Sequence, residues 1–411
     1  MEMKDSSDVQ AIVAEIRDAV RKSVAPPYAS ETVPLALHEP CLQGNENAYV
    51  KECIDTGWVS SAGKFVDRFE QKLADYTGVK RAVAVSNGTA ALHIALLLAG
   101  VEAGDEVLVP ALTFVATANA VSYLGASPHF VDSEDVSLGM DAETLDRYLS
   151  STVMLRDGHA FNKSTGRRIS VLLPMHTFGH PVNLDALTAV AEKYHLTLVE
   201  DAAESIGSFY KGRHTGHVGK LAALSFNGNK TITTGGGGAL LTNDDALGRL
   251  AKHLTTQAKL PHAWAFMHDY IGYNYRMPNI NAALGCAQLE ELDGFLSAQR
   301  ALADRYESAF APIDGIRFVK EPPYTRSNYW LQAICIEGTD FEMRDAVISG
   351  LHAANIFVRP AWRLLYKLPM FESAPRMDCA IAERLEASLI NLPSSVRLGQ
   401  TASATREKNE P

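Results

Sequence analysis

"RAVAVSNGTAALHIALLLAG", residues 81–100, joins a short apolar run to a segment with the length of a helix. The run at 81–86 is apolar at four of its six positions, as is typical of a strand buried on both faces. The helix is expected to begin at Gly88 and Thr89, directly after the strand. A strand that leads straight into a helix is the repeating unit of a parallel sheet, so this stretch favours the α/β class.

The same unit recurs further along the chain. Apolar runs that predict strands lie at residues 105–110, 127–132, 170–176, 196–201 and 221–226. Helix-length segments lie between several of them, most clearly at 184–195. This alternation predicts a mostly parallel central sheet sandwiched by helices. Reactive groups are then expected at the carboxyl edge of the sheet, where strands end and helices begin.

The two ends of the chain follow other patterns. Residues 8–24 have apolar positions at helical spacing and predict a helix that ends before Pro26. It is expected to pack on the main body or on a partner chain, with a mobile extension as the alternative. Beyond residue 290, helices alternate with short strand-like pieces, which indicates a smaller α+β domain. The predicted division is an N-terminal helix and extension (1–44), a large domain (45–290) and a small C-terminal domain (291–411).

The composition excludes several classes of protein. Of the 411 residues, 46% are hydrophobic and 21% are charged, as is usual for a soluble globular protein. A net charge of -10 gives no electrostatic reason to expect a nucleic acid or an anionic membrane as partner. No apolar run has the length of a signal peptide or a membrane span, so a cytoplasmic protein is expected. Five widely spaced cysteines argue against a disulfide framework and against a structural zinc site.

Polar residues follow two of the predicted strands. Gly88 and Thr89 stand at a strand-to-helix junction, where free N–H groups and the helix dipole favour an anion such as phosphate. A plain N-cap is the alternative there. Glu200 and Asp201 end another apolar strand. A carboxylate in that position either forms a structural ion pair or cap, or holds the nitrogen of a bound ring protonated.

"LSFNGNKTITTGGGGAL", residues 224–240, places Ser225 at a strand end and Lys230 five positions later. The lysine could be a solvated charge, a phosphate clamp or, if desolvated in a cleft, an amine that forms an imine with an aldehyde. The glycines at 235–238 follow the lysine, so the segment does not match a nucleoside-triphosphate loop, GxxxxGK[ST].

One cofactor needs all of these groups together. Pyridoxal 5′-phosphate (PLP) requires a phosphate cradle, an anion beside its ring nitrogen and an amine for its aldehyde. Gly88, Thr89, Asp201, Ser225 and Lys230 supply these groups. Phe114, at the neighbouring strand end, is a candidate cover for the ring, with a plain core phenylalanine as the alternative.

The chain resembles a known family in an ordered set of motifs. These are "GDEVLVPALTFVATANAV" (104–121), "PMHTFGHPVNLDAL" (174–187), "VEDAAESIGSFYKGRHTGHVG" (199–219), "LSFNGNK" (224–230) and "GYNYRMPNINAALGCAQLE" (272–290). They are similar to the nucleotide-sugar aminotransferases of DegT/StrS type, which are PLP enzymes of fold type I, the aspartate-aminotransferase-like class. The resemblance implies that Lys230 bonds the cofactor and moves protons and that Asp201 pairs with the ring nitrogen. It also implies that Gly88, Thr89 and Ser225 bind the phosphate, and that Phe114 stacks on the ring.

The resemblance also implies a homodimer. In the family an asparagine of the partner subunit reaches the cofactor phosphate, and Asn274 in "GYNYR" matches it. Two departures stand out. Glu204 replaces the usual glutamine near the ring hydroxyl, and "GGGG" replaces the usual "GDGG" after the lysine. Weaker candidates for contact with substrate or cofactor are Trp58, Ser60 and His176, for each of which a structural role is an equal alternative.

The amino-acid sequences of several segments are most similar to those of one subgroup of the family. Enzymes of that subgroup transfer the amino group of L-glutamate to position 4 of a UDP-linked 4-keto-6-deoxy-N-acetylglucosamine. That subgroup serves bacillosamine and legionaminic acid pathways. Amination at position 3, or of a dTDP- or GDP-linked sugar, is the alternative within the class. A non-catalytic regulator on the same fold is the alternative outside it, but a regulator has no need for Lys230 together with Asp201.

Overall fold

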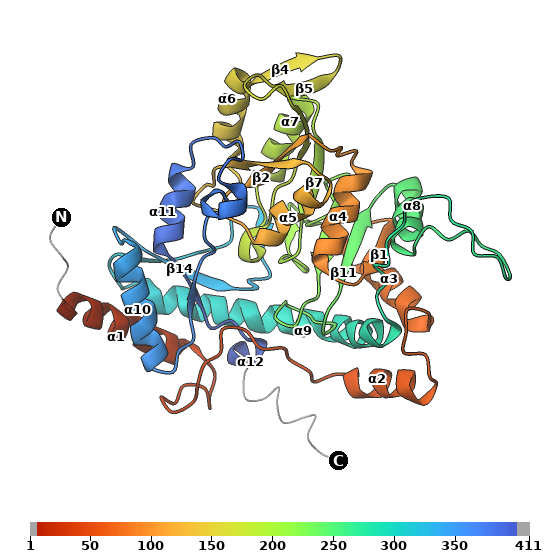
Figure 1. Ribbon diagram of the computed structural model, residues 1–411. Coiled ribbons are helices and arrows are strands. Elements are labelled where there is room, and N and C mark those ends of the chain that lie inside the picture. The colour runs from red at the N-terminus through yellow and green to blue at the C-terminus, as the bar shows by residue number, and fades with distance from the viewer. Residues whose placement is uncertain (1–5, 401–411) are drawn as a thin grey trace.

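The computed structural model describes residues 6–400 and is built around a nine-stranded sheet (Figure 1). Seven strands follow one another in the order β1-β11-β10-β7-β6-β2-β3, with β5 paired to β6 and β4 paired to β5. Their bounds are β1 Arg81–Val85, β2 Glu106–Pro110, β3 Ser127–Val131, β4 Val153–Arg156, β5 His159–Asn162, β6 Arg168–Leu172, β7 Thr197–Asp201, β10 Leu221–Ser225 and β11 Gly238–Thr242.

Five of these strands, from β10 through β7, β6 and β2 to β3, are parallel. β11 runs antiparallel between β1 and β10, so β1 points the same way as β10. The carboxyl ends of β1, β7 and β10 therefore meet at one edge, where β11 begins. The predicted mostly parallel α/β sheet is confirmed.

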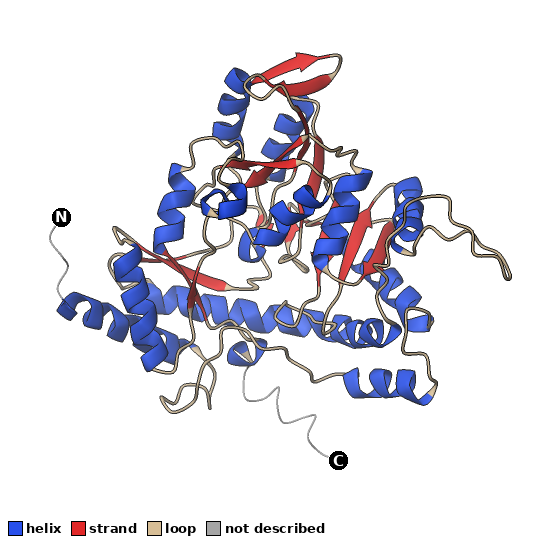
Figure 2. Ribbon diagram, in the orientation of Figure 1, coloured by secondary structure: helices blue, strands red, loops and turns tan. Residues whose placement is uncertain are grey.

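Helices cover both faces of this sheet (Figure 2). Their bounds are α1 Ser6–Ser23, α2 Glu46–Asp55, α3 Lys64–Thr77, α4 Gly88–Leu98, α5 Val115–Tyr123, α6 Ala142–Thr152, α7 Leu184–Lys193, α8 Asp245–Thr255, α9 Asn279–Phe310, α10 Phe341–Ala353, α11 Ala380–Ser388 and α12 Val396–Gly399. Short 3₁₀ turns lie at Thr177–Gly179, Leu365–Lys367 and Pro369–Phe371.

Alternation along β1 shows why both faces need a cover. Val83 and Val85 are buried in the core that contains α4, whereas Ala82 and Ala84 are buried in a second core with Phe69 of α3. Successive side chains of a strand point to opposite faces, so an apolar strand needs helices on both sides of its sheet.

A second, smaller sheet lies towards the C-terminus. Its antiparallel order is β12-β14-β16-β15, with bounds Ile316–Phe318, Gln332–Ile336, Leu389–Leu392 and Arg359–Pro360. A three-stranded sheet of β13 (Thr325–Arg326), β8 (Phe209–Tyr210) and β9 (Arg213–His214) connects it to the large sheet region. The N-terminal helix α1 packs on the main body, because its Ile16 and Val20 share a core with Tyr306 of α9 and Ile390 of β16.

Several elements differ from the sequence-based expectation. α9 begins at Asn279 and passes through residue 290, where the sequence predicted the boundary between the large and the small domain; the three-part domain division stays a prediction. β11 is not predicted, because its apolar run follows four glycines that read as a loop. The hairpin of β4 and β5 is also unpredicted. Within residues 6–400 no helix has the length and apolarity needed to cross a bilayer, and no cluster of potential metal ligands occurs.

Candidate active site

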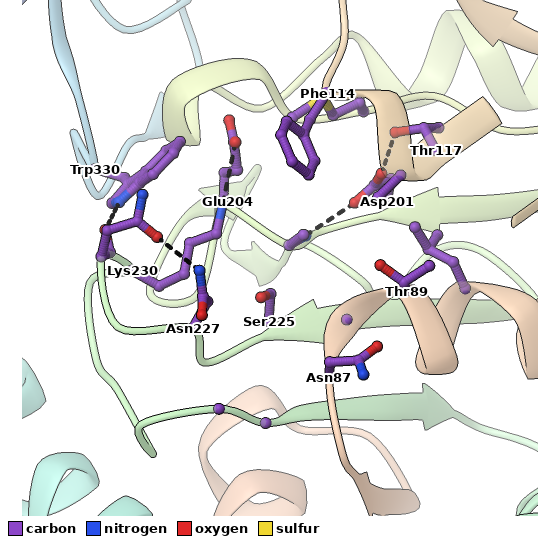
Figure 3. Close-up of a pocket in the computed structure, with 18 of the residues that line it drawn as sticks. Asn87, Thr89, Phe114, Thr117, Asp201, Glu204, Ser225, Asn227, Lys230 and Trp330 are labelled. Carbon is purple, nitrogen blue, oxygen red and sulfur yellow. Dashed lines mark hydrogen bonds and ion pairs between the residues drawn. The ribbon is translucent and has the colours of Figure 1, made fainter. Parts of the chain in front are cut away.

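A cavity of about 200 Å³ opens at the carboxyl edge of the large sheet (Figure 3). Seven of the eight predicted cofactor residues line it, namely Gly88, Thr89, Phe114, Asp201, Glu204, Ser225 and Lys230. Asn87, expected as a possible N-cap at the same junction as Gly88, also lines it. Residues that the sequence did not single out complete the lining, among them Thr117, Met175, Asn227, Asn229, Trp330, Arg359 and Trp362. The structure thus gathers groups from five strand ends and from the small C-terminal sheet.

One end of the cavity is the N-terminus of α4. Asn87 caps this helix by accepting the Ala90 N–H at 2.8 Å, so the N-cap expected as an alternative is present. The first N–H groups of a helix have no partner within it, and those of Gly88 and Thr89 lie at the cavity wall. A Cβ on Gly88 would lie 2.9 Å from the Cβ of Ser225. Only glycine allows this approach, which leaves N–H groups and the Ser225 hydroxyl around one anion-sized recess.

The glycine run forms the adjoining wall. Gly238 pairs with both Val85 and Ser225, and a Cβ there would lie 2.5 Å from the backbone carbon of Asn87. The run therefore lets β11 pass directly beneath the start of α4. A Cβ on Gly236, where the family pattern has aspartate, would meet nothing within 4 Å. That departure leaves open space at the cavity rim without disturbing the packing.

Asp201 lines the cavity and is 2% exposed. Its carboxylate accepts the Thr117 hydroxyl at 2.8 Å and the Ala203 N–H at 3.1 Å. Within residues 6–400 no cation forms an ion pair with it. Burial raises the pKa of Asp201, and the hydrogen bond from Thr117 offsets part of that increase. A buried carboxylate without a counter-ion is costly, so this position suits a ligand that brings a positive charge.

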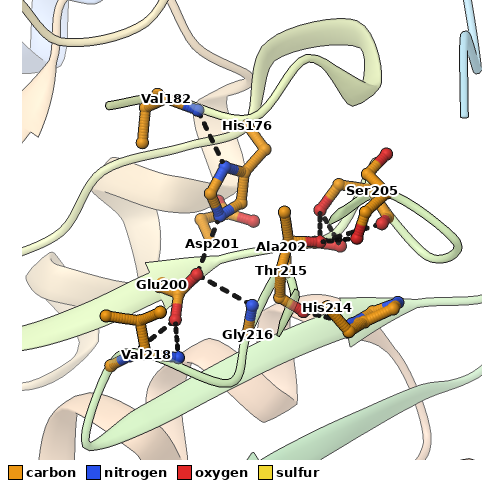
Figure 4. Close-up of polar contacts among 12 residues, drawn as sticks. His176, Val182, Glu200, Asp201, Ala202, Ser205, His214, Thr215, Gly216 and Val218 are labelled. Carbon is orange, nitrogen blue, oxygen red and sulfur yellow. Dashed lines mark hydrogen bonds and ion pairs between the residues drawn. The ribbon is translucent and has the colours of Figure 1, made fainter. Parts of the chain in front are cut away.

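Beneath Asp201, Glu200 and His176 form a fully buried pair (Figure 4). Glu200 accepts the His176 Nε2–H at 3.0 Å and three backbone N–H groups, of which Gly216 is one. Burial alone would raise the pKa of Glu200, but the hydrogen bond from His176 and those from the backbone lower it overall. His176 thus anchors the end of β7 and, among the described contacts, does not line the cavity, which matches its structural alternative.

Lys230 reaches the cavity from the loop after β10. Its Nζ lies 3.1 Å from Glu204 Oε1 and 3.8 Å from the centre of the Trp330 ring. The Trp330 indole N–H donates to the Asn229 carbonyl at 2.6 Å, which fixes the ring against the lysine loop. The lysine side chain is only 13% exposed. Lys230 is therefore not a solvated charge. It lies at the opposite end of the cavity from α4, so it does not act as a phosphate clamp in the anion recess.

Arg359 of β15 enters the same cavity from the small sheet. Within residues 6–400 its guanidinium takes part in no hydrogen bond and no ion pair. Burial lowers the pKa of Arg359, and the nearby Glu204 carboxylate acts in the opposite direction. Neither Arg359 nor Trp330 could be found from the sequence, because both lie more than 90 residues beyond the lining groups of the large sheet and follow no motif.

Three other candidates lie elsewhere. Asn274 is exposed and does not line this cavity. Trp58 is 58% exposed and lines a second cavity with Asn279, and Ser60 is exposed beside it. Phe114 lines the main cavity and is 51% exposed, so it is not a core phenylalanine.

Comparison with known proteins identifies the arrangement. The model of the DegT/DnrJ/EryC1/StrS aminotransferase family matches residues 40–405. This chain belongs to that family. A GDP-perosamine synthase of Caulobacter vibrioides is 38% identical over 368 residues, which cover 89% of this chain and 94% of that protein.

Other proteins similar to this chain support the same family assignment. EpsN of Bacillus subtilis, whose name provisionally assigns it to the PLP-dependent aminotransferases, is 38% identical over 82% of this chain and 84% of its own length. The crystal structure of a family aminotransferase from Brucella abortus superimposes with a TM-score of 0.78 at 29% identity, covering 87% of this chain and 91% of that one. Aminotransferases of this family are PLP-dependent and have the fold-type-I architecture.

The cavity fits that cofactor on its own features. The recess beside Gly88 is one that a Cβ would fill, which suits a phosphate. The buried Asp201 lacks a cation, as expected beside a protonated ring nitrogen. The partly buried amine of Lys230 lines the same cavity and is the primary amine that an aldehyde cofactor would need.

Proposed function

We propose that this chain uses PLP to transfer an amino group from L-glutamate to a nucleotide-linked keto sugar. The observation that carries the proposal is the sharing of one cavity by the Lys230 amine, the unpaired Asp201 carboxylate and the open N-terminus of α4. PLP supplies an aldehyde that can carry an amino group between two substrates and a ring that withdraws electrons from the reacting carbon.

The residues divide this work by position. Gly88, Thr89 and Ser225 would hold the phosphate at the N-terminus of α4. Asp201 would keep the ring nitrogen protonated, held in place by Thr117. These groups fix the orientation of the cofactor before any substrate enters.

Two groups complete the assignment at the other end of the cavity. Phe114 would cover one ring face. Lys230 would hold the aldehyde carbon and then, once displaced by an amino group, take and return protons at Nζ.

The donor's carboxylate has an available partner. Arg359 presents a guanidinium to the cavity, and no described residue pairs with it. Guanidinium groups bind carboxylates in a bidentate manner. We therefore assign Arg359 as the contact that favours an amino acid such as L-glutamate as donor.

The nucleotide is assigned from the relatives. The resemblance of several segments to one subgroup predicted a UDP-linked sugar. Three relatives, however, are named GDP-perosamine synthases. They come from Caulobacter vibrioides, Escherichia coli O157:H7 and Vibrio cholerae, and each is 37% or 38% identical to this chain. Their names favour the GDP-linked alternative, and we propose a GDP-linked 4-keto-6-deoxy sugar as the acceptor. Amination at position 4 and a cytoplasmic location stay predictions.

A visible absorption spectrum tests the function first. The purified protein with PLP is expected to show a visible band that bleaches on addition of L-glutamate. A protein that stays colourless with added PLP would overturn the proposal. Keto sugars linked to GDP or to UDP are then added to the bleached protein. The GDP-linked sugar is expected to restore the band with a kcat/KM about tenfold higher or more; the reverse order would return the assignment to UDP.

We also propose a homodimer in which Asn274 serves the partner's site. Tyr273 and Tyr275 pack on His93, with ring centroids 4.9 and 5.8 Å away. The intervening Asn274 is exposed. The arm between α8 and α9 protrudes from the body (Figure 1) and exposes Trp264, Phe266 and Ile271 by 80% or more. Exposed apolar patches of this kind mark protein interfaces.

Mixing two inactive variants tests this dimer. Lys230→Ala and Asn274→Ala proteins are denatured and refolded together. If Asn274 acts across the interface, each mixed dimer has one intact site, and random pairing restores about one quarter of the wild-type activity. If Asn274 acts in its own subunit, no activity above that of the separate variants returns. Each variant refolded alone is the control.

A further inference from the structure

The contact between Lys230 and Glu204 has a consequence beyond cofactor binding. Glu204 is the residue that departs from the glutamine of the family pattern. Its side chain is 2% exposed, and Oε1 lies 3.1 Å from Lys230 Nζ. Glutamine at this position would present a neutral amide to the lysine, whereas glutamate presents a group that can accept a proton.

The other contacts of Glu204 are compatible with accepting a proton from Lys230. Its Oε2 accepts the Phe178 backbone N–H at 3.0 Å. Among the described residues, Phe178 and Lys230 are the only hydrogen-bond donors to this carboxylate. The carboxylate is thus stabilised mainly by the lysine's positive charge and loses that support whenever Lys230 is neutral or bonded.

The charged and titratable groups around the pair come from three further parts of the chain. Asp201 of β7 faces Glu204, and Arg359 of β15 faces it from the small sheet. His38, in the segment before α2, faces Lys230; burial, with Lys230 and Arg359 nearby, lowers the pKa of His38 to about 3, so this ring is neutral. Glu204 is therefore the ionisable side chain that contacts Lys230 directly.

We propose that Glu204 is the proton acceptor and counter-ion of Lys230, and holds the proton that the lysine releases before its amine can act. An N–H bond of the Lys230 ammonium breaks and an O–H bond on Glu204 Oε1 forms, giving a neutral amine and a carboxylic acid. No electron is transferred. This assignment rests on the proposed function, in which Lys230 must act as a free amine.

Burial makes the neutral pair accessible. Burial raises the pKa of Glu204, although attraction to Lys230 opposes that increase. In a largely buried site, an ion pair and a neutral hydrogen-bonded pair differ less in free energy than they do in solution. The proton can therefore return to Lys230 when the amine is required to donate it.

Competitive acetylation of the cofactor-free protein tests the inference. Acetic anhydride reacts with neutral amines only, so labelling of Lys230 against pH, measured by mass spectrometry relative to the exposed Lys220, reports the pKa of Lys230. In Glu204→Gln the amide keeps an acceptor for Phe178 but removes the negative charge. The midpoint for Lys230 is expected to fall by about 1 to 3 pH units.

A matched control exists elsewhere in the chain. Glu70 also accepts one lysine, Lys252 at 2.6 Å, and one backbone N–H, that of Ala84 at 2.8 Å, but lies outside the cavity. Glu70→Gln should leave the Lys230 midpoint unchanged. Circular dichroism verifies that each variant is folded. If Glu204→Gln does not fold, Glu204→Met is used instead. Methionine is also neutral and of similar length, and the same downward shift of the Lys230 midpoint is expected.

The outcomes separate this inference from the proposed function. A Lys230 midpoint that is the same in the wild type and in the folded Glu204 variant overturns the role of Glu204, even if PLP produces the visible band. Absence of that band in the wild type overturns the proposed function, whatever the labelling shows. A downward shift confined to the Glu204 variant supports the role of Glu204 as the counter-ion that exchanges a proton with Lys230.

Discussion

Replacing Lys230 with alanine is expected to reduce amino transfer by about 10⁴-fold or more, because one side chain serves as both nucleophile and proton carrier. The visible band formed with PLP should also disappear. Activity is measured as 2-oxoglutarate released from L-glutamate in the presence of keto sugar. The fold should persist, since the lysine side chain contributes to the cavity wall and not to either hydrophobic core.

Two further variants separate the amine from its charge. Lys230→Arg keeps a cation beside Glu204 but cannot supply a neutral amine, so it should be as inactive as Lys230→Ala. Lys252→Ala removes a lysine that is also paired with a glutamate, outside the cavity, and should keep wild-type activity. Substantial activity in Lys230→Arg would contradict the assigned role.

Replacing Asp201 with asparagine is expected to lower kcat/KM by about 10²- to 10³-fold, the range seen when one preorganised charge-stabilising group is removed. Asparagine can keep the hydrogen bonds to Thr117 and Ala203 but cannot hold a ring nitrogen protonated. Asp146→Asn, which removes an exposed carboxylate paired with Lys193, is the control.

The Asp201→Asn variant is also expected to change how the stability of the protein depends on pH. Because the pKa of Asp201 is raised in the folded protein, folding binds a proton there between the unfolded pKa and the higher folded value. This carboxylate therefore reduces stability progressively as pH rises through that window. Without cofactor, Asp201→Asn should melt at the same temperature as the wild type or higher at neutral pH, and differ least at low pH. A marked loss of stability at neutral pH would show that the carboxylate is structural.

Much of the large sheet could be predicted from the sequence, because most of its parallel strands are short apolar runs that alternate with helix-length segments. Asp201 and Ser225 each occupy the last position of such a strand. Once strands are parallel, their carboxyl ends share an edge, which brings distant motifs together. The same reasoning missed β11, whose place between β1 and β10 depends on glycines that have no side chain to show a pattern.

The rest of the cavity was beyond sequence reasoning for a different reason. Trp330 and Arg359 come from the small sheet, and their approach to Lys230 depends on how that sheet packs on the large one. The ion pair of Glu204 with Lys230 likewise depends on the loop after β10 folding back over β7. Long-range packing of this kind leaves no local periodicity to detect.

The helix α9 ties the stability of both halves together. At 1.5 Å per residue its 32 residues span roughly 48 Å. Its first half buries Cys286 and Leu292 in the core of the large sheet, and its second half buries Tyr306 and Phe310 in the core of the small one. Because both cores pack against α9, unfolding of either core would remove contacts that stabilise the helix and with it the other core. A cut at residue 290 would therefore leave two fragments, each with an incomplete hydrophobic core.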